Sequence, residues 1–339
     1  MAASSKPAVK PPALQPGGMI AVVSPSAGFA GRFPRRTERG VEALEALGYR
    51  AKLMPHAMEN QSWVSAPVAD RVADLEAAFL DPEVSVIMSA IGGNHSAQLL
   101  PTLDMHLIAA HPKILCGYSD ITSLLNGINV MTGLVTFYGP ALLPQIGEFP
   151  RPLPDTIAAF RSATSDAGPM MALPEFPSAI TEMIDWAADS IRPRTITATA
   201  GRQVLRAGQG AGRLVCGCLP TLRHLIGTRW EPDFDGSVLV LDLPDRGYDA
   251  SELDADLWHL VNSGRLESVA ALLVGRLPAA PEEEQALLDR VVAEVCAPFR
   301  FPVISRFEVG HGDPALTLPI GCQAEVDGAK VAITESGVQ

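Results

Sequence analysis

Residues 84–96 read VSVIMSAIGGNHS and residues 114–122 read ILCGYSDIT, and these two stretches decide the fold class. Each begins as a short apolar run, typical of a buried strand, and then opens into glycine or a tight turn. Upstream, Met19–Val23 is a further apolar run, and apolar residues recur at helical spacing over Arg36–Leu47 and Ala69–Leu80. Strands that alternate with helices predict a mostly parallel sheet covered on both faces, with its active site beyond the carboxyl ends of the strands.

The rest of the chain changes character twice. Residues 148–200 are rich in Pro, Ala, Thr and Ser and only weakly periodic, which suits a linker and a surface loop. Beyond residue 208 the alternation returns and predicts a second α/β domain, with strands at Val238–Leu243, Val269–Val274, Pro302–Ser305 and within Cys322–Thr334, and helices at Ser251–Asn262 and Glu282–Cys296. We therefore divide the chain into a disordered tail (1–17), an N-terminal α/β domain (18–165), a linker with a substrate loop (166–200) and a C-terminal domain (201–339).

Composition excludes several classes of protein. With 339 residues, 47% of them hydrophobic and 19% charged, the chain is long and apolar enough to bury a core, so it is not intrinsically disordered. It contains no run of 18 or more apolar residues, and its first residues (MAASSKPAVKPPALQPGG) lack the apolar stretch of a secretory signal. We therefore expect a cytoplasmic protein without membrane contact. The net charge of −12 argues against a nucleic-acid partner.

The five cysteines do not form a disulfide framework in a chain of this length: Cys116, Cys216, Cys218, Cys296 and Cys322. The close pair Cys216-Gly217-Cys218 leaves two interpretations open. It is either a pair of small buried thiols, which we favour, or a metal or redox site. The odd count agrees with a reducing compartment. We expect no bound metal and no cofactor.

Gly117-Tyr118-Ser119-Asp120 is the sharpest local signal for chemistry. A serine at a tight strand-to-helix turn is lifted off the sheet, with backbone N–H groups beside it that can face an oxyanion. The stretch is not a full G-x-S-x-G elbow, because Ile121 stands two residues after Ser119. The alternative is that Ser119 or Asp120 only caps the helix that follows.

Gly92-Gly93 also follows a predicted strand, and adjacent glycines permit the close backbone approach that an anion or oxyanion site requires. A nucleotide phosphate loop is the competing interpretation, but neither known glycine-rich nucleotide motif is present. His95 stands two residues after Gly93, where it could line the same site.

A serine nucleophile needs a neutral imidazole and a carboxylate that orients it. His311 lies between glycines in Val309-Gly310-His311-Gly312, which lets an imidazole project from a tight loop, although a surface-loop histidine would look the same. Asp242 ends the VLVLD strand, and Asp245, Asp249 and Glu252 lie nearby. An acid after a strand also commonly caps the next helix.

Four separated blocks together resemble the LD-carboxypeptidase family of serine peptidases, which includes the microcin C immunity peptidases. The blocks are IGGNHSAQLLP (91–101), PKILCGYSDIT (112–122), GRLVCGCLPTLRHLIGTRWEPDFDGSVLVLDL (212–243) and GHGDPALTLPIGCQAEVD (310–327). The resemblance implies a flavodoxin-like N-terminal domain, a smaller swivelling β/β/α C-terminal domain and a homodimer. The resemblance runs from about residue 19 to the end of the chain.

The resemblance also implies roles for individual residues. Ser119 would be the nucleophile and His311 the general base, while the N–H groups of Asp120 and the Gly92-Gly93 turn would form the oxyanion hole. The family's third member is a glutamate, and its position falls on Asp242, one methylene shorter. Either the backbone lies closer to His311 here, or another acid serves.

The family's G-G-N segment reads Cys216-Gly217-Cys218 here, so Cys218 stands where a substrate-binding amide is expected. The stretch SAITEMIDWAADSIRPRT (178–195) resembles the longer loop of the microcin C immunity branch. Its Trp186 could stack on an aromatic part of a ligand, or could anchor the linker to the first domain.

We therefore expect a serine carboxypeptidase that releases D-alanine from cytoplasmic muropeptide tetrapeptides during wall recycling. The first alternative is an immunity-type peptidase that hydrolyses aminoacyl-adenylate analogues. The second, which the Asp242 and Cys218 departures keep open, is a peptide-binding protein without catalysis. In every case the expected partner is a small peptide or a peptide-like nucleotide.

Overall fold

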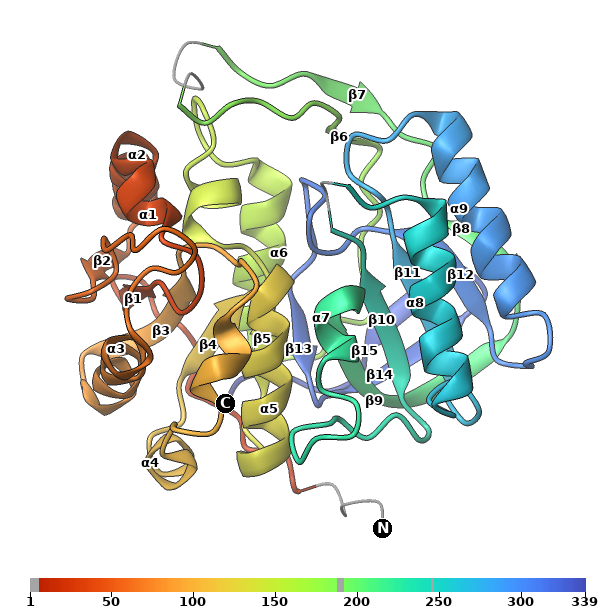
Figure 1. Cartoon of the computed structure of the whole chain (residues 1–339), viewed down its shortest axis with the longest axis horizontal. Coiled ribbons are helices and arrows are strands. Elements are labelled where there is room, and N and C mark those ends of the chain that lie inside the picture. Colours follow the sequence, from red (N-terminus) through yellow and green to blue (C-terminus); the bar gives the residue numbers. More distant parts are fainter. Residues whose placement is uncertain (1–5, 188–191, 245–246) are drawn as a thin grey trace.

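The computed structural model describes residues 6–187, 192–244 and 247–339. The N-terminal and C-terminal halves lie side by side, each built on its own sheet, with helix α5 (Thr122–Thr132) at the boundary between them (Figure 1). Their buried apolar side chains form one continuous core. No helix in this described part of the chain is both long enough and apolar enough to span a membrane.

The first sheet has six strands in the order β13-β5-β4-β3-β1-β2. Its strands are β1 (Met19–Val23), β2 (Arg50–Leu53), β3 (Val84–Ser89), β4 (Ile114–Gly117), β5 (Thr136–Tyr138) and β13 (Leu318–Ile320). The first five are parallel and follow the order 2-1-3-4-5 of flavodoxin-like sheets. The predicted flavodoxin-like N-terminal domain is confirmed.

Helices accompany the parallel strands, as the hydrophobic spacing predicted. They are α1 (Phe29–Arg32), α2 (Pro34–Ala46), α3 (Val68–Leu80), α4 (Met105–Ala110), α5 and α6 (Pro154–Ser165). The predicted apolar face of α3 is buried at Val72, Leu75, Ala78 and Phe79. Helix α5 ends at Gly133, which takes the left-handed conformation that commonly stops a helix.

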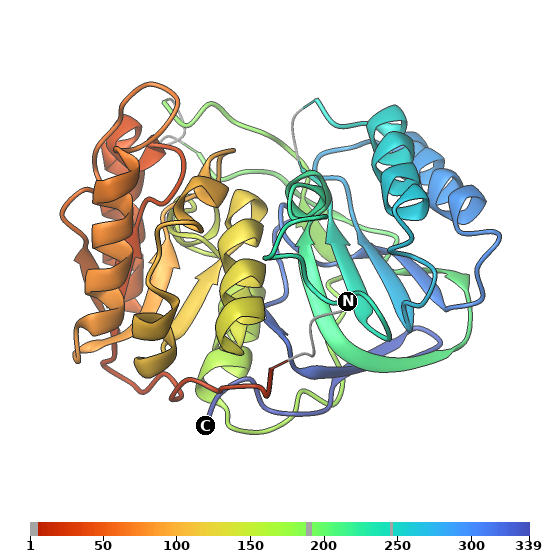
Figure 2. The ribbon, with the colours of Figure 1, turned by 60° about the horizontal axis from the view of Figure 1, so that its bottom comes forward.

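The second sheet has seven strands in the order β15-β14-β9-β10-β11-β12-β8. These strands are β8 (Gln203–Arg206), β9 (Gln209–Cys218), β10 (Val238–Asp242), β11 (Ala271–Gly275), β12 (Val303–Phe307), β14 (Gln323–Asp327) and β15 (Lys330–Ile333). The central strands β9 to β12 are parallel, and the outer ones are antiparallel. Helices α8 (Ala250–Asn262) and α9 (Glu282–Val295) pack together on one side, and the short α7 (Leu219–Arg223) faces α5 (Figures 1 and 2). The predicted second α/β unit is thus present.

Strand β13 belongs to the C-terminal half but completes the first sheet. It pairs antiparallel with β5, with Leu318 opposite Tyr138 and Ile320 opposite Thr136. The chain that leaves β12 in the second sheet therefore crosses to the first sheet before it returns as β14. His311 lies on this crossing, so the crossing carries it from one half toward the other.

The structure corrects the predicted disordered tail for residues 6–17. Leu14 is buried, and the backbone N–H of Ala13 donates to Gln339 at 2.9 Å, while Gln339 N–H donates to Pro11 at 3.0 Å. Val9 also bridges Leu134. A proline-rich composition pointed to disorder, but these backbone bonds to the chain's other end and the burial of Leu14 hold the segment in place. Residues 1–5 lie outside the described residues.

The weakly periodic region 148–200 contains helix α6 and a two-stranded ribbon, β6 (Ser178–Ile180) with β7 (Ile196–Ala198). The ribbon runs across the top of both halves in Figure 1. Part of the predicted substrate loop, residues 188–191, lies outside the described residues.

Candidate active site

Ser119 stands at a strained turn between β4 and α5. Its φ is +61°, a left-handed conformation that costs a non-glycine residue energy and persists only where the surroundings enforce it. Gly92, in the loop after β3, makes room for this turn, since a Cβ added there would lie 2.8 Å from the Ser119 Cβ. The predicted strand-to-helix elbow is present, with a turn of 3-10 helix over Ser119–Ile121 before α5.

The structure brings Ser119, His311 and Asp242 together from both halves of the chain. The His311 Nε2 lies 3.0 Å from the Ser119 Oγ, and its Nδ1 lies 2.8 Å from the Asp242 Oδ2. The His311 backbone N–H also donates to Asp242 Oδ1 at 3.1 Å. Asp242 is fully buried, so its carboxylate is shielded from water. The two hydrogen bonds from His311 hold the carboxylate in place. This is the arrangement that a nucleophile, a general base and an orienting acid require.

The short acid reaches the imidazole because the loop of His311 passes directly over it. A Cβ on Gly310 would lie 1.9 Å from the Asp242 Cγ, and Gly310 has a φ of +71° that favours glycine. Of the other acids considered, Asp249 caps α8 and Glu252 is exposed, while Asp245 lies outside the described residues. Close approach of the backbone therefore explains how an aspartate, rather than the glutamate that the resemblance implies, reaches His311.

Tyr138, at the end of β5, is a member of this network that the sequence did not predict. Its hydroxyl donates to Asp242 Oδ2 at 2.6 Å and accepts the Ser119 backbone N–H at 3.0 Å. Burial, reinforced by the charge of Asp242, raises the pKa of the Tyr138 hydroxyl, which therefore stays protonated. The signal that could have found it is a polar residue at the carboxyl end of the strand beside the Ser119 strand.

Asp120 ties together three loops at the carboxyl edge of the first sheet. Its Oδ2 accepts the Ser26 hydroxyl at 2.6 Å and the backbone N–H groups of His95 and Ser96 at 2.9 and 2.8 Å. The Asp120 N–H itself lies in the first turn of the helix, where backbone donors have no helical acceptor. A Cβ on Gly92 would lie 3.1 Å from this nitrogen, so the Gly92-Gly93 turn and the Asp120 N–H lie close together, and their joint role as an oxyanion hole stays a prediction.

These residues open into a cavity of about 580 Å³. Gly92, Gly93, Ser119 and His311 line it, and so do two of the three residues predicted to bind substrate, Trp186 and Cys218. The third, His95, is not among the described residues that line the cavity. The neighbouring Asn94 lines it instead, and the His95 backbone N–H donates to Asp120.

Trp186 makes the contacts expected of an anchor for its loop. Its ring packs edge-on against Phe33, with centroids 5.6 Å apart, and the Arg36 guanidinium lies 4.6 Å from its centroid. These contacts anchor the loop of residues 178–187 to the first half. The same residue also lines the cavity, and stacking on an aromatic part of a ligand stays a prediction.

The cysteine pair fits the buried-thiol interpretation. All five cysteines are free and buried. Cys218, Asp242 and His311 form the one group among the described residues with ligand atoms close enough for a metal ion, within 4.8 Å of one another. Burial first, and the charge of Asp242 second, raise the pKa of the Cys218 thiol, as expected for a buried thiol. His311 and Asp242 are also already bonded to each other, so this group is a poor fit for a metal.

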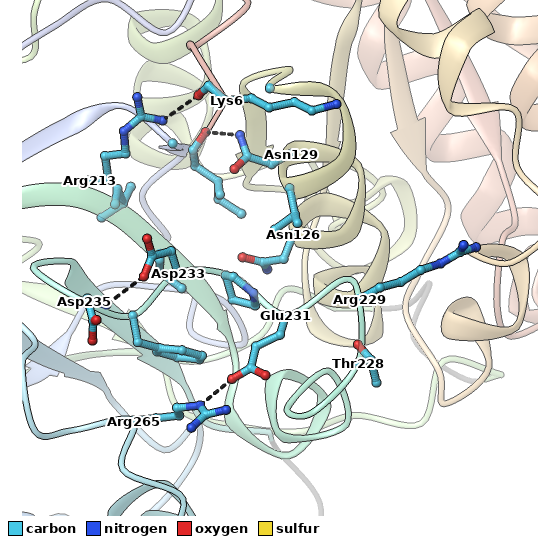
Figure 3. Close-up of a pocket in the computed structure, with 18 of the residues that line it drawn as sticks. Lys6, Asn126, Asn129, Arg213, Thr228, Arg229, Glu231, Asp233, Asp235 and Arg265 are labelled. Atoms are coloured by element: carbon cyan, nitrogen blue, oxygen red, sulfur yellow. Dashed lines mark hydrogen bonds and ion pairs between the residues drawn. The ribbon is translucent and has the colours of Figure 1, made fainter. Parts of the chain in front are cut away.

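A second cavity, of about 600 Å³, lies between the halves on another part of the surface (Figure 3). Its polar groups are largely engaged with one another, since Glu231 pairs with Arg265 and Arg213 donates to the Lys6 carbonyl at 3.1 Å. The described residues that line it include no serine, histidine or cysteine. Nucleophilic chemistry is therefore concentrated in the cavity of Ser119.

Comparison with known proteins relates both halves of the chain to one family. Residues 20–139 match the family model described as the LD-carboxypeptidase N-terminal domain, and residues 211–326 match the LD-carboxypeptidase C-terminal domain. Relatives include YocD of Bacillus subtilis, whose name describes it as a carboxypeptidase, with 34% identity over 93% of this chain and 94% of that protein. The murein tetrapeptide carboxypeptidase of Pseudomonas aeruginosa is 26% identical, over 93% and 94%.

The microcin C7 self-immunity protein MccF of Escherichia coli is also similar, with 32% identity over 94% of each chain. A solved structure of MccF in complex with aspartyl sulfamoyl adenosine superimposes with a TM-score of 0.89 at 29% identity, covering 98% of this chain and 100% of that one. The relatives thus carry names of two kinds, wall-peptide carboxypeptidase and immunity protein.

We predict that Tyr138→Phe slows the reaction of Ser119 with a serine-reactive phosphonate by about 10- to 100-fold, as expected for one lost hydrogen bond to a buried charge. Without the hydroxyl, the Asp242 carboxylate favours the protonated form of His311 more strongly. The neutral imidazole that acts as the base then forms only at higher pH, so the pH profile of labelling shifts to higher pH. Tyr49→Phe, which removes a hydroxyl bonded to Arg161 elsewhere, is the control. An unchanged profile in Tyr138→Phe would contradict this role.

We predict that Gly310→Ala abolishes labelling of Ser119, because the added Cβ would overlap the Asp242 carboxylate and force the His311 loop away. Gly312→Ala is the matched control, since a Cβ there meets nothing within 4 Å. Melting temperatures show whether both variants fold. Equal labelling of the two would rule out the close approach as a requirement.

Proposed function

Because the chain belongs to the LD-carboxypeptidase family and is therefore a hydrolase, we propose that it is a serine carboxypeptidase acting on muropeptide tetrapeptides. It cleaves the amide between the L-centre of a diamino acid and the terminal D-alanine. The observation that carries this proposal is the hydrogen-bonded series Ser119–His311–Asp242, at 3.0 and 2.8 Å, which opens into a cavity of about 580 Å³.

The geometry supports acyl transfer through Ser119. The His311 Nε2 accepts the Ser119 proton as the Oγ attacks the substrate carbonyl, and Asp242 stabilises the resulting imidazolium. The backbone N–H groups of Asp120 and the Gly92-Gly93 turn bind the oxyanion. His311 then gives its proton to the leaving amine of D-alanine. A water molecule, deprotonated by His311, hydrolyses the acyl-enzyme and restores Ser119.

The substrate is the part of the proposal that rests on relatives. The murein tetrapeptide carboxypeptidase of Pseudomonas aeruginosa supports a wall peptide. We place the reaction in the cytoplasm, in wall recycling, and the homodimer that the family resemblance implies remains a prediction.

A second candidate is hydrolysis of an aminoacyl-adenylate analogue, as in a detoxification role. The structure of MccF with aspartyl sulfamoyl adenosine favours it, together with Trp186 in the cavity wall. An indole ring offers a nucleobase a stacking surface that a D-alanyl peptide does not need.

Mass spectrometry of products separates the two candidates. Purified protein is incubated separately with a tetrapeptide ending in D-alanine and with aspartyl sulfamoyl adenosine, and Ser119→Ala is run alongside. We expect release of D-alanine by the wild type and none by Ser119→Ala. Cleavage of the adenosine compound alone would favour the second candidate. Turnover of neither, with saturable binding and no phosphonate labelling of Ser119, would favour a binding protein.

We predict that Asp242→Asn lowers kcat by about three to four orders of magnitude, because an amide neither fixes the required tautomer of His311 nor stabilises its charged form. The side chain keeps its size, so we expect the melting temperature to stay within a few degrees of the wild type. Near-normal turnover would transfer the role of the acid to another residue.

A further inference from the structure

A buried arginine on helix α3 donates hydrogen bonds to the loops around the active site. Arg71 is only 3% exposed, and its Nη1 donates to the main-chain carbonyls of Pro25 at 2.9 Å and of His95 at 3.3 Å. Its Nη2 donates to the side-chain carbonyl of Gln98 at 2.8 Å. Pro25 lies in the loop after β1 and His95 in the loop after β3. One guanidinium therefore joins two loops at the carboxyl edge of the first sheet (Figure 1).

The carboxylate of Asp120 joins the same two loops at neighbouring positions. It accepts the hydroxyl of Ser26, the residue after Pro25, and the backbone N–H of His95. The main chain of His95 is thus held at both of its polar groups, with its N–H bonded to a negative charge and its carbonyl to a positive one. Burial lowers the pKa of Arg71, and the charge of Asp120 raises it. The two charges therefore support each other as well as the loops.

The Gly92-Gly93 turn lies between these fixed points. Adjacent glycines have wide conformational freedom, whereas a donor to an oxyanion has to be fixed before the reaction begins. The Gly92 carbonyl accepts the Ala27 N–H at 3.1 Å, which ties the turn to the loop after β1. His95, two residues after Gly93, is tied to the same loop through Arg71. The geometry of the turn therefore depends on how the two loops are held together.

The packing of α3 does not itself call for a charge at residue 71. The apolar part of the buried face of this helix packs into the core, and a buried charge can often be replaced by an apolar side chain of similar volume without loss of stability. What an apolar side chain cannot supply are the donors to Pro25 and His95. A methionine at residue 71 therefore separates the stability of the helix from the geometry of the loops.

We propose that Arg71 is a positioning residue for the reaction of Ser119. Its guanidinium holds the loops after β1 and β3 in one arrangement, and this arrangement places the Gly92-Gly93 turn beside the nucleophile. A Cβ on Gly92 would lie 3.0 Å from the Ser119 Oγ, so a small shift of the turn alters its distance to the reacting atoms. Arg71 is not among the described residues that line the cavity, so it acts through the loops. This proposal rests on the proposed hydrolysis at Ser119.

A role in fixing the turn affects the covalent step and not the binding that precedes it, because the oxyanion charge develops only in the transition state. We expect Arg71→Met to slow the covalent reaction of Ser119 with a serine-reactive phosphonate by about 10- to 100-fold. The affinity for the unreacted phosphonate should change by less than about threefold, and hydrolysis should likewise lose kcat at nearly constant KM. Arg71→Lys keeps the charge without the planar fork, so its rate should lie between those of Arg71→Met and the wild type.

The concentration dependence of labelling measures the two quantities separately, as the affinity for the phosphonate and the rate constant of the covalent step. Arg206→Met is the matched control, because Arg206 also donates to two main-chain carbonyls, those of Phe301 and Cys296, but in the C-terminal half. It should label like the wild type. Melting temperatures show which variants fold. If Arg71→Met does not, Gln98→Met removes one bond of the same guanidinium from an exposed residue and should slow the covalent step by about three- to tenfold.

A slower covalent step at unchanged affinity, in a folded variant, supports the role of Arg71. An unchanged rate constant in Arg71→Met, or in Gln98→Met where that variant decides, would overturn this role and leave Ser119 as the nucleophile. Equal losses of rate and affinity, or the same loss in Arg206→Met, would also overturn it, because they indicate a general disturbance of the cavity. A wild type that is neither labelled nor active would contradict the proposed function itself, and the role of Arg71 with it.

Discussion

The hydrogen bond between His311 and Ser119 is the contact on which the whole site depends, because it joins the two halves of the chain. Strand β12 ends at Phe307 in the second sheet, and β13 begins at Leu318 in the first. The loop that carries His311 is therefore held at both ends, once in each sheet. Backbone N–H of Cys218 donates to the Thr122 hydroxyl at 2.9 Å, and Asn126 donates to the Cys216 carbonyl at 3.0 Å. The positions of Ser119, His311 and Asp242 relative to one another therefore depend on how the two halves pack together.

Asp242 is one methylene shorter than the glutamate that the family resemblance implies, and the surrounding residues compensate for its length. Gly310 lets the His311 backbone lie against the carboxylate, which then accepts from both the ring and the main-chain N–H of His311. Tyr138 adds a third donor and at the same time accepts the Ser119 N–H. One buried hydroxyl thereby couples the acid to the turn of the nucleophile. An aspartate side chain has one rotatable bond fewer than glutamate. The backbone itself must therefore place Asp242 within reach of His311.

Local patterns predicted the parts of the fold that depend on local spacing. The runs at β1, β3 and β4 and the apolar face of α3 were recognisable because neighbours in sequence decide them. The insertion of β13 into the first sheet was not, since its partner β5 is far away in sequence and its three residues carry no periodicity. Residues 6–17 were misjudged because proline content says nothing of Leu14 packing against the core. Ser119 and His311 stand in recognisable turns, whereas the role of Tyr138 becomes visible only when the two halves bring it against Asp242.

A protein that only bound peptides would have little use for what this site maintains. The left-handed Ser119 and the fully buried Asp242 both oppose folding, by about 1–3 kcal/mol for the strained backbone alone. Binding requires neither, because the cavity walls, Trp186 and the charged side chains would serve as well with an ordinary turn at residue 119. What these costly features accomplish is to place the Ser119 Oγ within 3.0 Å of an imidazole oriented by a carboxylate. Among the functions considered, only hydrolysis makes use of that geometry.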